Sequence, residues 1–316
     1  MQLGIVRTEA SKASKAGLLI ENVKRNYDLY LLILPTLIYV IIFLYVPMYG
    51  LQIAFKDFIA VKGFWGSPWV GFEHFERFFR AFNFWQIFNN TLSISLYSLV
   101  VGFPCPIILA IMLNEVRHKH YKKTIQMVTY APYFISNVVM VGIMVCFLST
   151  RMGIVNQLIR LLGGEPVSFM TRPELFQTIY VLTGVWQSVG FSAIIYIAVL
   201  SGIDPQLHEA AIMDGASKLK RIRHIDIPGI IPTAIILLIL SLGNIMNVGF
   251  EKILLMQNKL NLSASEVIST YTYSVGLIGG EFGFSTAVGL FNSVINFILL
   301  VLVNQLAKHL GETSLW

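Results

Sequence analysis

The stretch LHEAAIMDGASKLKRIRHIDIPGIIP, residues 207–232, carries acidic and basic side chains between two long apolar segments. Just before it, Asp204 and Pro205 suit the N-cap and the first position of a helix that runs through QLHEAAIM. Gly215 can adopt the positive φ that ends a helix, and Ser217 can cap a second helix through KLKRIRHI. The stretch therefore predicts two short helices joined by a glycine turn.

Six uncharged runs make up most of the remaining sequence. The protein has 316 residues, 55% hydrophobic and 13% charged, whereas soluble domains carry about a quarter charged residues. Each run reaches the roughly 20 residues that a helix needs to cross a bilayer, and none alternates as a β-barrel strand does. We therefore predict an all-α integral membrane protein with six transmembrane helices. The runs are 29–55, 81–114 (with the span at 91–113), 124–150, 175–203, 227–250 (with the span starting at Pro228) and 282–307.

The distribution of Lys and Arg predicts the orientation. With six spans both termini lie on one side, and that side holds 14 Lys and Arg residues against 9 on the other. The positive-inside rule then places both termini and the stretch 207–232 in the cytoplasm. On this view the net charge of +6 reflects topology and contact with anionic lipid, and argues little for a nucleic-acid partner.

The expected organisation is a core of five spans preceded by one further span. Cys105 and Cys146 both fall inside spans, which argues against a disulfide framework or a metal site. The predicted segments are a cytoplasmic tail at 1–28, the first span with an external segment at 29–84, the core at 85–306 with a cytoplasmic loop at 204–228, and a second tail at 307–316.

The first helix of the stretch has the composition of a docking surface. Ala210 and Ala211 would let another backbone approach closely, while Glu209 offers a carboxylate that can orient a contact. Leu207, Ala211 and Asp214 follow i, i+4, i+7 spacing and would share one helix face. A solvated connecting loop is the alternative, and the residues alone favour neither.

A spaced pattern runs through the stretch and consists of Glu209, Ala210, Ala211, Asp214, Gly215, Ala216, Ile225, Pro228 and Pro232. It resembles the EAA signature of ABC importer permeases, roughly EAA-x2-DGA followed by an aromatic, an isoleucine, a Leu-Pro and a further Pro. The sequence departs from that pattern at Ile222, where an aromatic is usual, and at Ile227, where Leu is usual. Both substitutions are apolar, and the resemblance extends from about Trp85 to Leu306.

The segment YDLYLLILP…YVPMYGLQIAFKDF also resembles one branch of the maltose-permease-like group, which serves oligosaccharide and polysaccharide uptake in bacteria. The resemblance implies a type I ABC importer permease in the bacterial cell membrane that forms half of a translocation pathway. It further implies a second homologous permease, two cytoplasmic ATPase subunits and an extracellular or periplasmic solute-binding protein. The residues that would dock the ATPase are Glu209, Ala210, Ala211, Asp214, Gly215 and Ala216.

The sequence contains no G-x-x-x-x-G-K-[ST] phosphate loop. We therefore expect a transport subunit rather than an enzyme, with no cofactor of its own and with ATP and Mg bound by the partner ATPase.

Polar side chains inside the spans are the candidates for the solute pathway. Amides beside a flat aromatic ring suit sugar hydroxyls and the apolar face of a pyranose, whereas interhelical hydrogen bonding, worth about 0.6 kcal/mol, is the competing interpretation. Spacings of three and four place the two asparagine pairs each on one helix face. The candidates are Trp186, Gln187, Asn244, Asn247, Asn292 and Asn296.

Charge leaves the class of saccharide open. Nine basic against eight acidic residues on the predicted outer side give a net of only +1, so neutral and uronic-acid-containing saccharides both fit. An ATP-independent secondary transporter or channel subunit is the alternative function. The EAA stretch and the lack of an acidic residue within the six runs argue against it.

Overall fold

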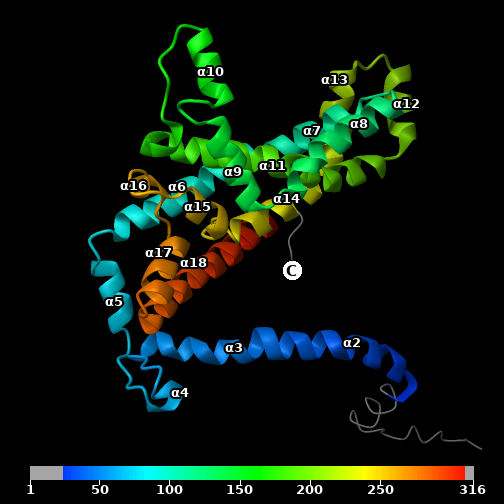
Figure 1. The fold of residues 1–316 in the computed structure, drawn as a ribbon. Helices are drawn as coiled ribbons and strands as arrows, with labels where there is room; N and C mark the ends of the chain where they lie inside the picture. Colours follow the sequence, from blue (N-terminus) through cyan, green and yellow to red (C-terminus); the bar gives the residue numbers. More distant parts are fainter. Residues whose placement is uncertain (1–23, 310–316) are drawn as a thin grey trace, which may run out of the picture. The chain divides into compact units, whose positions relative to one another are not determined.

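The computed structural model describes residues 24–309, which are helical apart from connecting segments and an isolated bridge between Lys56 and Trp69 (Figure 1). Residues 1–23 and 310–316, which hold most of the two predicted tails, lie outside the described residues. The chain divides into two compact units at residues 1–52 and 53–316. The external segment that we grouped with the first span therefore belongs to the larger unit.

The first unit contains most of a long apolar helical segment that includes two prolines. The helix comprises α2 (Tyr27–Val40), the π-helical turn η1 (Ile41–Tyr45), α3 (Val46–Met48) and the 3-10 helix η2 (Tyr49–Phe55), whose last three residues belong to the larger unit. Helical turns continue over 29 residues, past both Pro35 and Pro47. The wider π turn lies just before Pro47, where a proline ring would otherwise collide with a carbonyl of the preceding turn. No residue of α2 is buried, as hydrocarbon surroundings permit.

The larger unit consists of short and long helices in the following order: α4 (Gly63–Gly66), α5 (Glu73–Arg80), α6 (Phe84–Gly102), α7 (Pro104–Asn114), α8 (Lys119–Tyr130), η3 (Ala131–Phe134), α9 (Asn137–Phe147), α10 (Ile154–Leu161), η4 (Phe169–Thr171), α11 (Pro173–Ser201), α12 (Pro205–Met213), α13 (Lys218–Arg221), η5 (Ile222–Asp226), α14 (Ile227–Leu242), α15 (Phe250–Met256), α16 (Leu262–Ser265), α17 (Ile268–Tyr273), η6 (Ser274–Ile278) and α18 (Phe282–His309).

Five helical segments of the described chain are long and apolar enough to cross a membrane, and a bent pair makes up to six. The segments are Tyr27–Phe55, Phe84–Asn114, Pro173–Ser201, Lys218–Leu242 and Phe282–His309. The bent pair joins Lys119–Phe134 to Asn137–Phe147 at 103°. This confirms an all-α membrane protein.

The third predicted span, 124–150, is wrong as a single helix. Pro132 lies in the first turn of the 3-10 helix η3. The Ser136 side chain then accepts a hydrogen bond from the Val139 amide, which starts a new helix in another direction. A proline and a serine N-cap within five residues thus supply a stop and a start inside one uncharged run.

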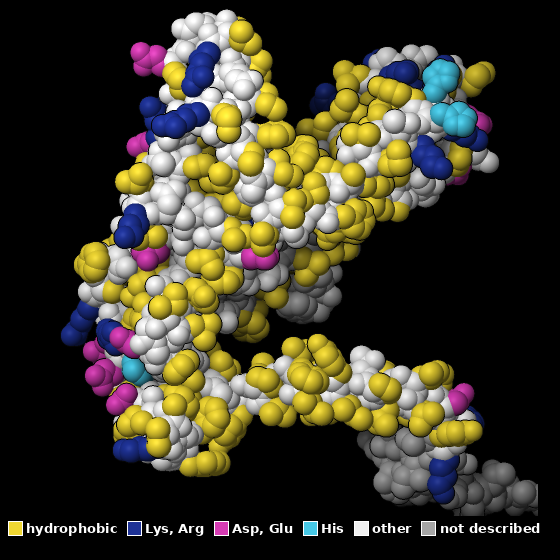
Figure 2. Space-filling view, viewed as in Figure 1, with side chains coloured by type: hydrophobic (Ala, Val, Ile, Leu, Met, Phe, Trp, Pro, Cys, Tyr) yellow, Lys and Arg dark blue, Asp and Glu magenta, His cyan; other side chains and the backbone are white. Residues whose placement is uncertain are grey.

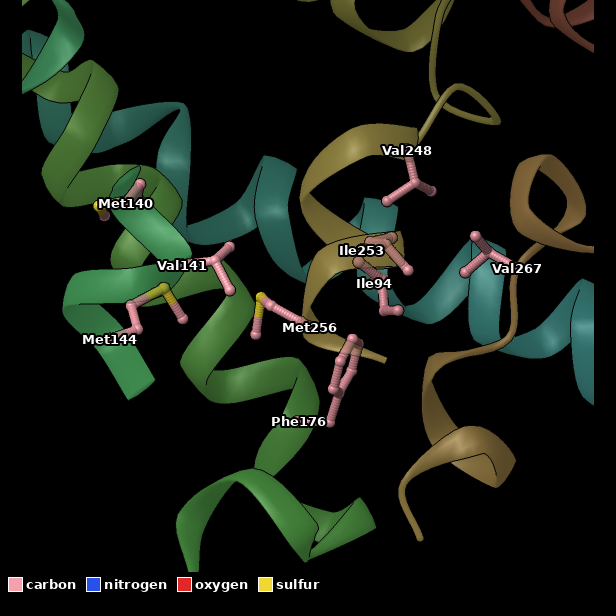
Figure 3. Close-up of a cluster of buried hydrophobic side chains, with 9 residues drawn as sticks. All are labelled: Ile94, Met140, Val141, Met144, Phe176, Val248, Ile253, Met256 and Val267. Carbon is pink, nitrogen blue, oxygen red and sulfur yellow. The ribbon is translucent and has the colours of Figure 1, made fainter. Parts of the chain in front are cut away.

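Helix α11 is the centre of the larger unit and packs against α6, α7, α8 and α14. Gly190 of α11 lies directly on the carbonyl of Thr129 in α8, where any added Cβ would overlap the backbone. One hydrophobic cluster joins α6, α9, α11 and α15, with Phe176, Met256 and Ile94 pointing toward one another (Figure 3). A second cluster joins Phe78 of α5 to α6 and α18.

Two small lobes lie at opposite ends of α11, one formed by α10 and the other by α12 and α13 (Figure 1). In the α10 lobe, the fully buried Asn156 accepts from the Val167 amide at 2.7 Å and donates to the Val167 carbonyl at 2.9 Å. These bonds hold the loop that returns to α11. Helix α10 is thus a short helix whose following loop is held by the Asn156 side chain.

Helices α17, η6 and α5 pack against the first half of α18. Arg77 of α5 donates to Glu281 at 3.0 Å, and this hydrogen bond holds the pKa of the Glu281 carboxyl below its usual value. Gly276 lies against Ser285 and so allows close helix packing, whereas Gly280 forms a turn at φ +75°.

Candidate functional site

The loop at 204–217 folds as its local sequence predicts. The Asp204 carboxylate accepts a hydrogen bond from the Gln206 amide at 2.9 Å, and Pro205 occupies the first turn of α12. Gly215 has φ +76°, and the Ala216 amide donates back to the Ala211 carbonyl at 2.8 Å, which closes the helix end. The Ser217 hydroxyl accepts from the Lys220 amide at 3.4 Å and starts the next helix.

The expectation that the second helix is short and separate is wrong. Helical turns run without a break from Lys218 to Leu242, so Pro228 lies inside one 25-residue segment. The π-helical turn η5 ends at Asp226, two residues before Pro228. Its longer hydrogen-bonded rings remove the collision between the proline ring and the preceding carbonyl, which lets the helix continue. A shift of the loop is therefore transmitted directly to a membrane-spanning helix.

The residues predicted to dock the ATPase lie on the outside of this lobe. Glu209, Ala210, Asp214 and Gly215 are exposed, while Ala211 and Ala216 are partly buried. Two large apolar side chains that the motif did not single out, Met213 and Leu219, are 87% and 75% exposed. These exposed apolar side chains lie near the small residues Ala210 and Ala211 in the sequence, and exposed apolar surface of this kind suits a protein partner.

A histidine–carboxyl contact and an ion pair fasten the lobe to the membrane helices. His208 Nε2 of α12 lies 3.4 Å from Asp226 Oδ1, whose side chain is 1% exposed. Lys218 Nζ lies 3.5 Å from Glu115, just past the end of α7. Basic and histidine side chains gather over this lobe, at the upper right of Figure 2. The lobe is thus attached to two spans by side chains as well as by the chain.

We expect His208→Ala to weaken coupling between the lobe and the membrane helices. The substitution removes the imidazole that lies beside the buried Asp226 carboxyl, and loss of a polar neighbour from a buried group costs about 1–3 kcal/mol. Thermal stability of the purified transporter and solute carried per ATP should both fall. His224→Ala is the matched control, since His224 is exposed on the same lobe. Equal behaviour of the two variants, or no recovery in His208→Ala with Asp226→Asn, contradicts the prediction.

A central cavity of about 680 Å³ lies between α6, α7, η3, α11, α14 and the turn at 244–249. Its apolar wall includes Tyr133 and Phe191, whose rings stack at 3.9 Å between centroids. Hydroxyl and amide groups dominate its polar wall, and these are Ser95, Ser98, Tyr133, Tyr180, Ser188, Ser192, Tyr196, Ser241, Asn244 and Asn247. Flat aromatic surfaces beside many uncharged hydrogen-bonding groups match the surface of a sugar.

The sequence did not single out the serines and tyrosines of this wall. Ser95, Ser98 and Gly102 recur at spacings of three and four in α6, as do Gly184, Ser188 and Ser192 in α11. Such a stripe of small hydroxyl residues is also what helix packing in a membrane requires. The stripe was therefore visible in the sequence, but its function was not.

The four asparagine candidates meet at one point, although only one pair lies on a helix face. Helix α14 ends at Leu242, so Asn244 and Asn247 lie in the turn that follows, and the helix-face expectation is wrong for them. Asn292 of α18 donates to Asn247 at 2.9 Å, and the Met246 amide donates to the buried Asn296 at 3.0 Å. The α18 pair therefore fixes the turn, which presents Asn244 and Asn247 to the central cavity.

The remaining two candidates, Gln187 and Trp186, do not line the central cavity. Gln187 lines a side cavity and donates to the Ile135 carbonyl at the bend between η3 and α9. Trp186 is 50% exposed and lines neither the central nor the side cavity. The structure therefore does not bring Trp186 together with the other candidates.

The side cavity, of about 310 Å³, adjoins the central cavity and shares Ser98, Tyr180 and Ser188 with it. Lys252 of α15 lines it and is 6% exposed. Burial lowers the pKa of the Lys252 ammonium to about 8. This lowering of the pKa from 10.5 corresponds to roughly 3 kcal/mol against the charged form. Burial of the protonated Lys252 side chain at this position is therefore energetically unfavourable.

Comparison with known proteins gives the family. Residues 102–312 match the family described as binding-protein-dependent transport system inner membrane component. The chain belongs to this family. Its fold is that of an ABC importer permease, and the protein is a multi-pass membrane transport component rather than an enzyme.

Relatives of the permease cover nearly its whole length. It is 43% identical over 293 residues to the protein LplB of Bacillus subtilis, covering 93% of this chain and 92% of that one. It is 42% identical over 305 residues to the polygalacturonan/rhamnogalacturonan transport system permease protein YteP of Bacillus subtilis, covering 96% and 95%. A solved bacterial alginate ABC transporter, in complex with an alginate pentasaccharide-bound periplasmic protein, matches with a TM-score of 0.86 at 40% identity, covering 93% and 99%.

Proposed function

We propose that this permease forms half of the translocation pathway of an ATP-driven bacterial importer of oligosaccharides or polysaccharides. The observation that carries the proposal is the central cavity of about 680 Å³, walled by hydroxyls, amides and aromatic rings. The similarity to a polygalacturonan/rhamnogalacturonan transport system permease and to an alginate ABC transporter supports the substrate class. The second half of the pathway would be a homologous permease, and a solute-binding protein would deliver the saccharide from outside.

The lobe formed by α12 and α13 would dock a cytoplasmic ATPase. The exposed Glu209, Ala210, Asp214 and Gly215, together with the apolar Met213, form the surface for it. Because Lys218–Leu242 is one helix, movement of a docked ATPase would tilt a span that borders the central cavity. ATP and Mg would be bound by two such ATPase subunits. Shifting the two membrane states decisively takes about 5 kcal/mol of differential binding, which ATP-driven closure can supply.

The orientation follows from charge. Under the predicted six-span topology, the side assigned to the loop 204–228 holds 14 Lys and Arg residues against 9 on the other side, which supports a cytoplasmic lobe and cytoplasmic termini. The basic lobe would also contact anionic lipid headgroups.

Uptake by the reconstituted complex tests the proposal. Proteoliposomes that contain this permease, its partner permease, the ATPase and the binding protein should take up labelled oligosaccharides only with ATP inside. Asn247→Leu should lower uptake about 5- to 10-fold, since it removes an amide from the cavity wall and a bond to Asn292. Uptake without ATP would support the alternative of a secondary transporter or channel, and uptake of no saccharide would contradict the proposal.

A further inference from the structure

We propose that Lys252 and the side cavity bind the carboxylate of an acidic sugar residue, a uronate, on its way through the permease. The inference rests on the proposed saccharide function and adds the charge of the substrate. It assigns a binding group to a position that the sequence did not single out.

Lys252 is a buried cation that faces open space. Its side chain is 6% exposed and lines the side cavity of about 310 Å³, which opens onto the same serines and Tyr180 as the central cavity. Gly184 of α11 stands opposite, and a Cβ there would lie 3.4 Å from Lys252 Nζ. The glycine thus keeps the space in front of the ammonium clear.

The ammonium of Lys252 lacks a counter-ion among residues 24–309, in which the ion pairs lie elsewhere. Nζ donates to the Tyr180 carbonyl at 3.1 Å and lies 4.9 Å from the Tyr180 ring centre. An ammonium has three donors, so the carbonyl leaves two. Buried charges are normally paired, and the unmatched charge here therefore points to an anion that comes and goes.

The carboxylate adjacent to Lys252 in the sequence is already engaged. Glu251, the preceding residue, is exposed, and its carboxylate accepts a hydrogen bond from Asn137 Nδ2 at 2.6 Å. Among the described residues that line the central and side cavities, Lys252 is the only charged one. An anion that enters them meets this cation without a competing protein carboxylate in the wall.

The rest of the side cavity suits a sugar ring that bears the anion. Ser98, Ser188, Asn137 and Gln187 supply uncharged donors and acceptors around Lys252. A carboxylate takes charge-assisted hydrogen bonds from an ammonium, while ring hydroxyls pair with amides and serines. A neutral saccharide would satisfy the second set and leave the ammonium unmatched. With burial lowering the pKa only to about 8, Lys252 stays mostly protonated at neutral pH.

Lys252 could instead have a purely structural role, because its hydrogen bond to the Tyr180 carbonyl joins α15 to α11. The test must therefore separate charge recognition from folding. Trigalacturonate and its fully methyl-esterified form differ in the carboxylate charges and share the ring hydroxyls, which makes them a matched pair of probes.

Binding of both probes to the purified permease–ATPase complex in detergent, measured by calorimetry, decides between the two. Lys252→Gln should weaken trigalacturonate binding about 10- to 100-fold, as expected for loss of a charge-assisted hydrogen bond, and leave the methyl ester within about 2-fold. Lys252→Arg should retain part of the affinity for the acid. Lys259→Gln, in the exposed loop after α15, is the control and should change neither.

Three results would overturn the inference. These are equal weakening of both probes by Lys252→Gln, equal or absent binding of acid and ester by the wild-type complex, and an effect of Lys259→Gln as large as that of Lys252→Gln. Failure of the underlying function looks different, because the wild-type proteoliposomes would then take up neither neutral nor acidic saccharides. Uptake of neutral saccharides alone would preserve the function and reject the carboxylate site.

Discussion

Gly215→Val should abolish coupled uptake while the protein still inserts and folds in the membrane. Gly215 has φ +76°, a region that a β-branched residue enters at a cost of about 1–3 kcal/mol. A Cβ at this position would meet open space, so the effect comes from backbone conformation and not from a clash. The turn that sets α12 at an angle to the helix Lys218–Leu242 would open, and the docking surface would lose its shape.

The measurement is ATPase activity stimulated by substrate-loaded binding protein, together with uptake. Loss of coupling by 1–3 kcal/mol corresponds to a fall of roughly 5- to 150-fold in the stimulated activity. Gly163→Val is a close control, because Gly163 ends α10 with φ +82° and its added Cβ also meets open space. It carries the same backbone strain at the opposite end of α11, so stimulated ATPase activity should persist. Gly215→Asn should retain more activity than Gly215→Val, since Asn tolerates positive φ.

Gly190→Leu should prevent assembly of the folded permease. Gly190 of α11 lies against the Thr129 carbonyl of α8, and an added side chain has no room unless the two helices separate. Overpacking of this kind costs about 1–3 kcal/mol, and more where the obstacle is backbone that cannot rotate away. The bend between η3 and α9, held by Gln187, would be displaced with α8.

The yield of monodisperse protein and its thermal unfolding in detergent would measure this effect. Gly142→Leu is the control, because Gly142 is a helical glycine of α9 whose added Cβ meets nothing within 4 Å. If both variants gave the same yield and the same unfolding temperature, close approach of α8 and α11 would not limit stability.

Local signals predicted the coupling loop in detail. Asp204, Gly215 and Ser217 each act on amides or carbonyls within five residues, so their roles depend on adjacent sequence alone. The same reasoning failed at Pro228. A π turn before the proline lets the helix continue, and no residue pattern distinguished a continuous helix from a new helix that starts at Pro228. The reasoning failed at 124–150 for a related reason, since length and hydropathy do not report where a helix bends.

Contacts between residues far apart in the sequence determine which side chains line the cavity. The turn that carries Asn244 and Asn247 is held by Asn296, 50 residues from Met246, and Lys252 reaches a carbonyl 72 residues away. Hydropathy placed Asn244 and Asn247 inside a span, although the helix ends before them. Trp186 was singled out as an aromatic beside an amide, but the rotation of α11 exposes it away from both cavities.

The sequence by itself determined the helical membrane class, the approximate spans and the helix–glycine–helix loop, because hydropathy, caps and positive φ act over one or two turns. Only the tertiary structure decided which small residues border open space and which let helices touch. It also decided that Lys252 is buried beside a hydroxyl-lined cavity, since the side chains around it come from α6, α9 and α11. The free energy of a charged side chain depends on whether water or apolar groups surround it. The residues adjacent to Lys252 in the sequence do not specify which distant groups pack around it.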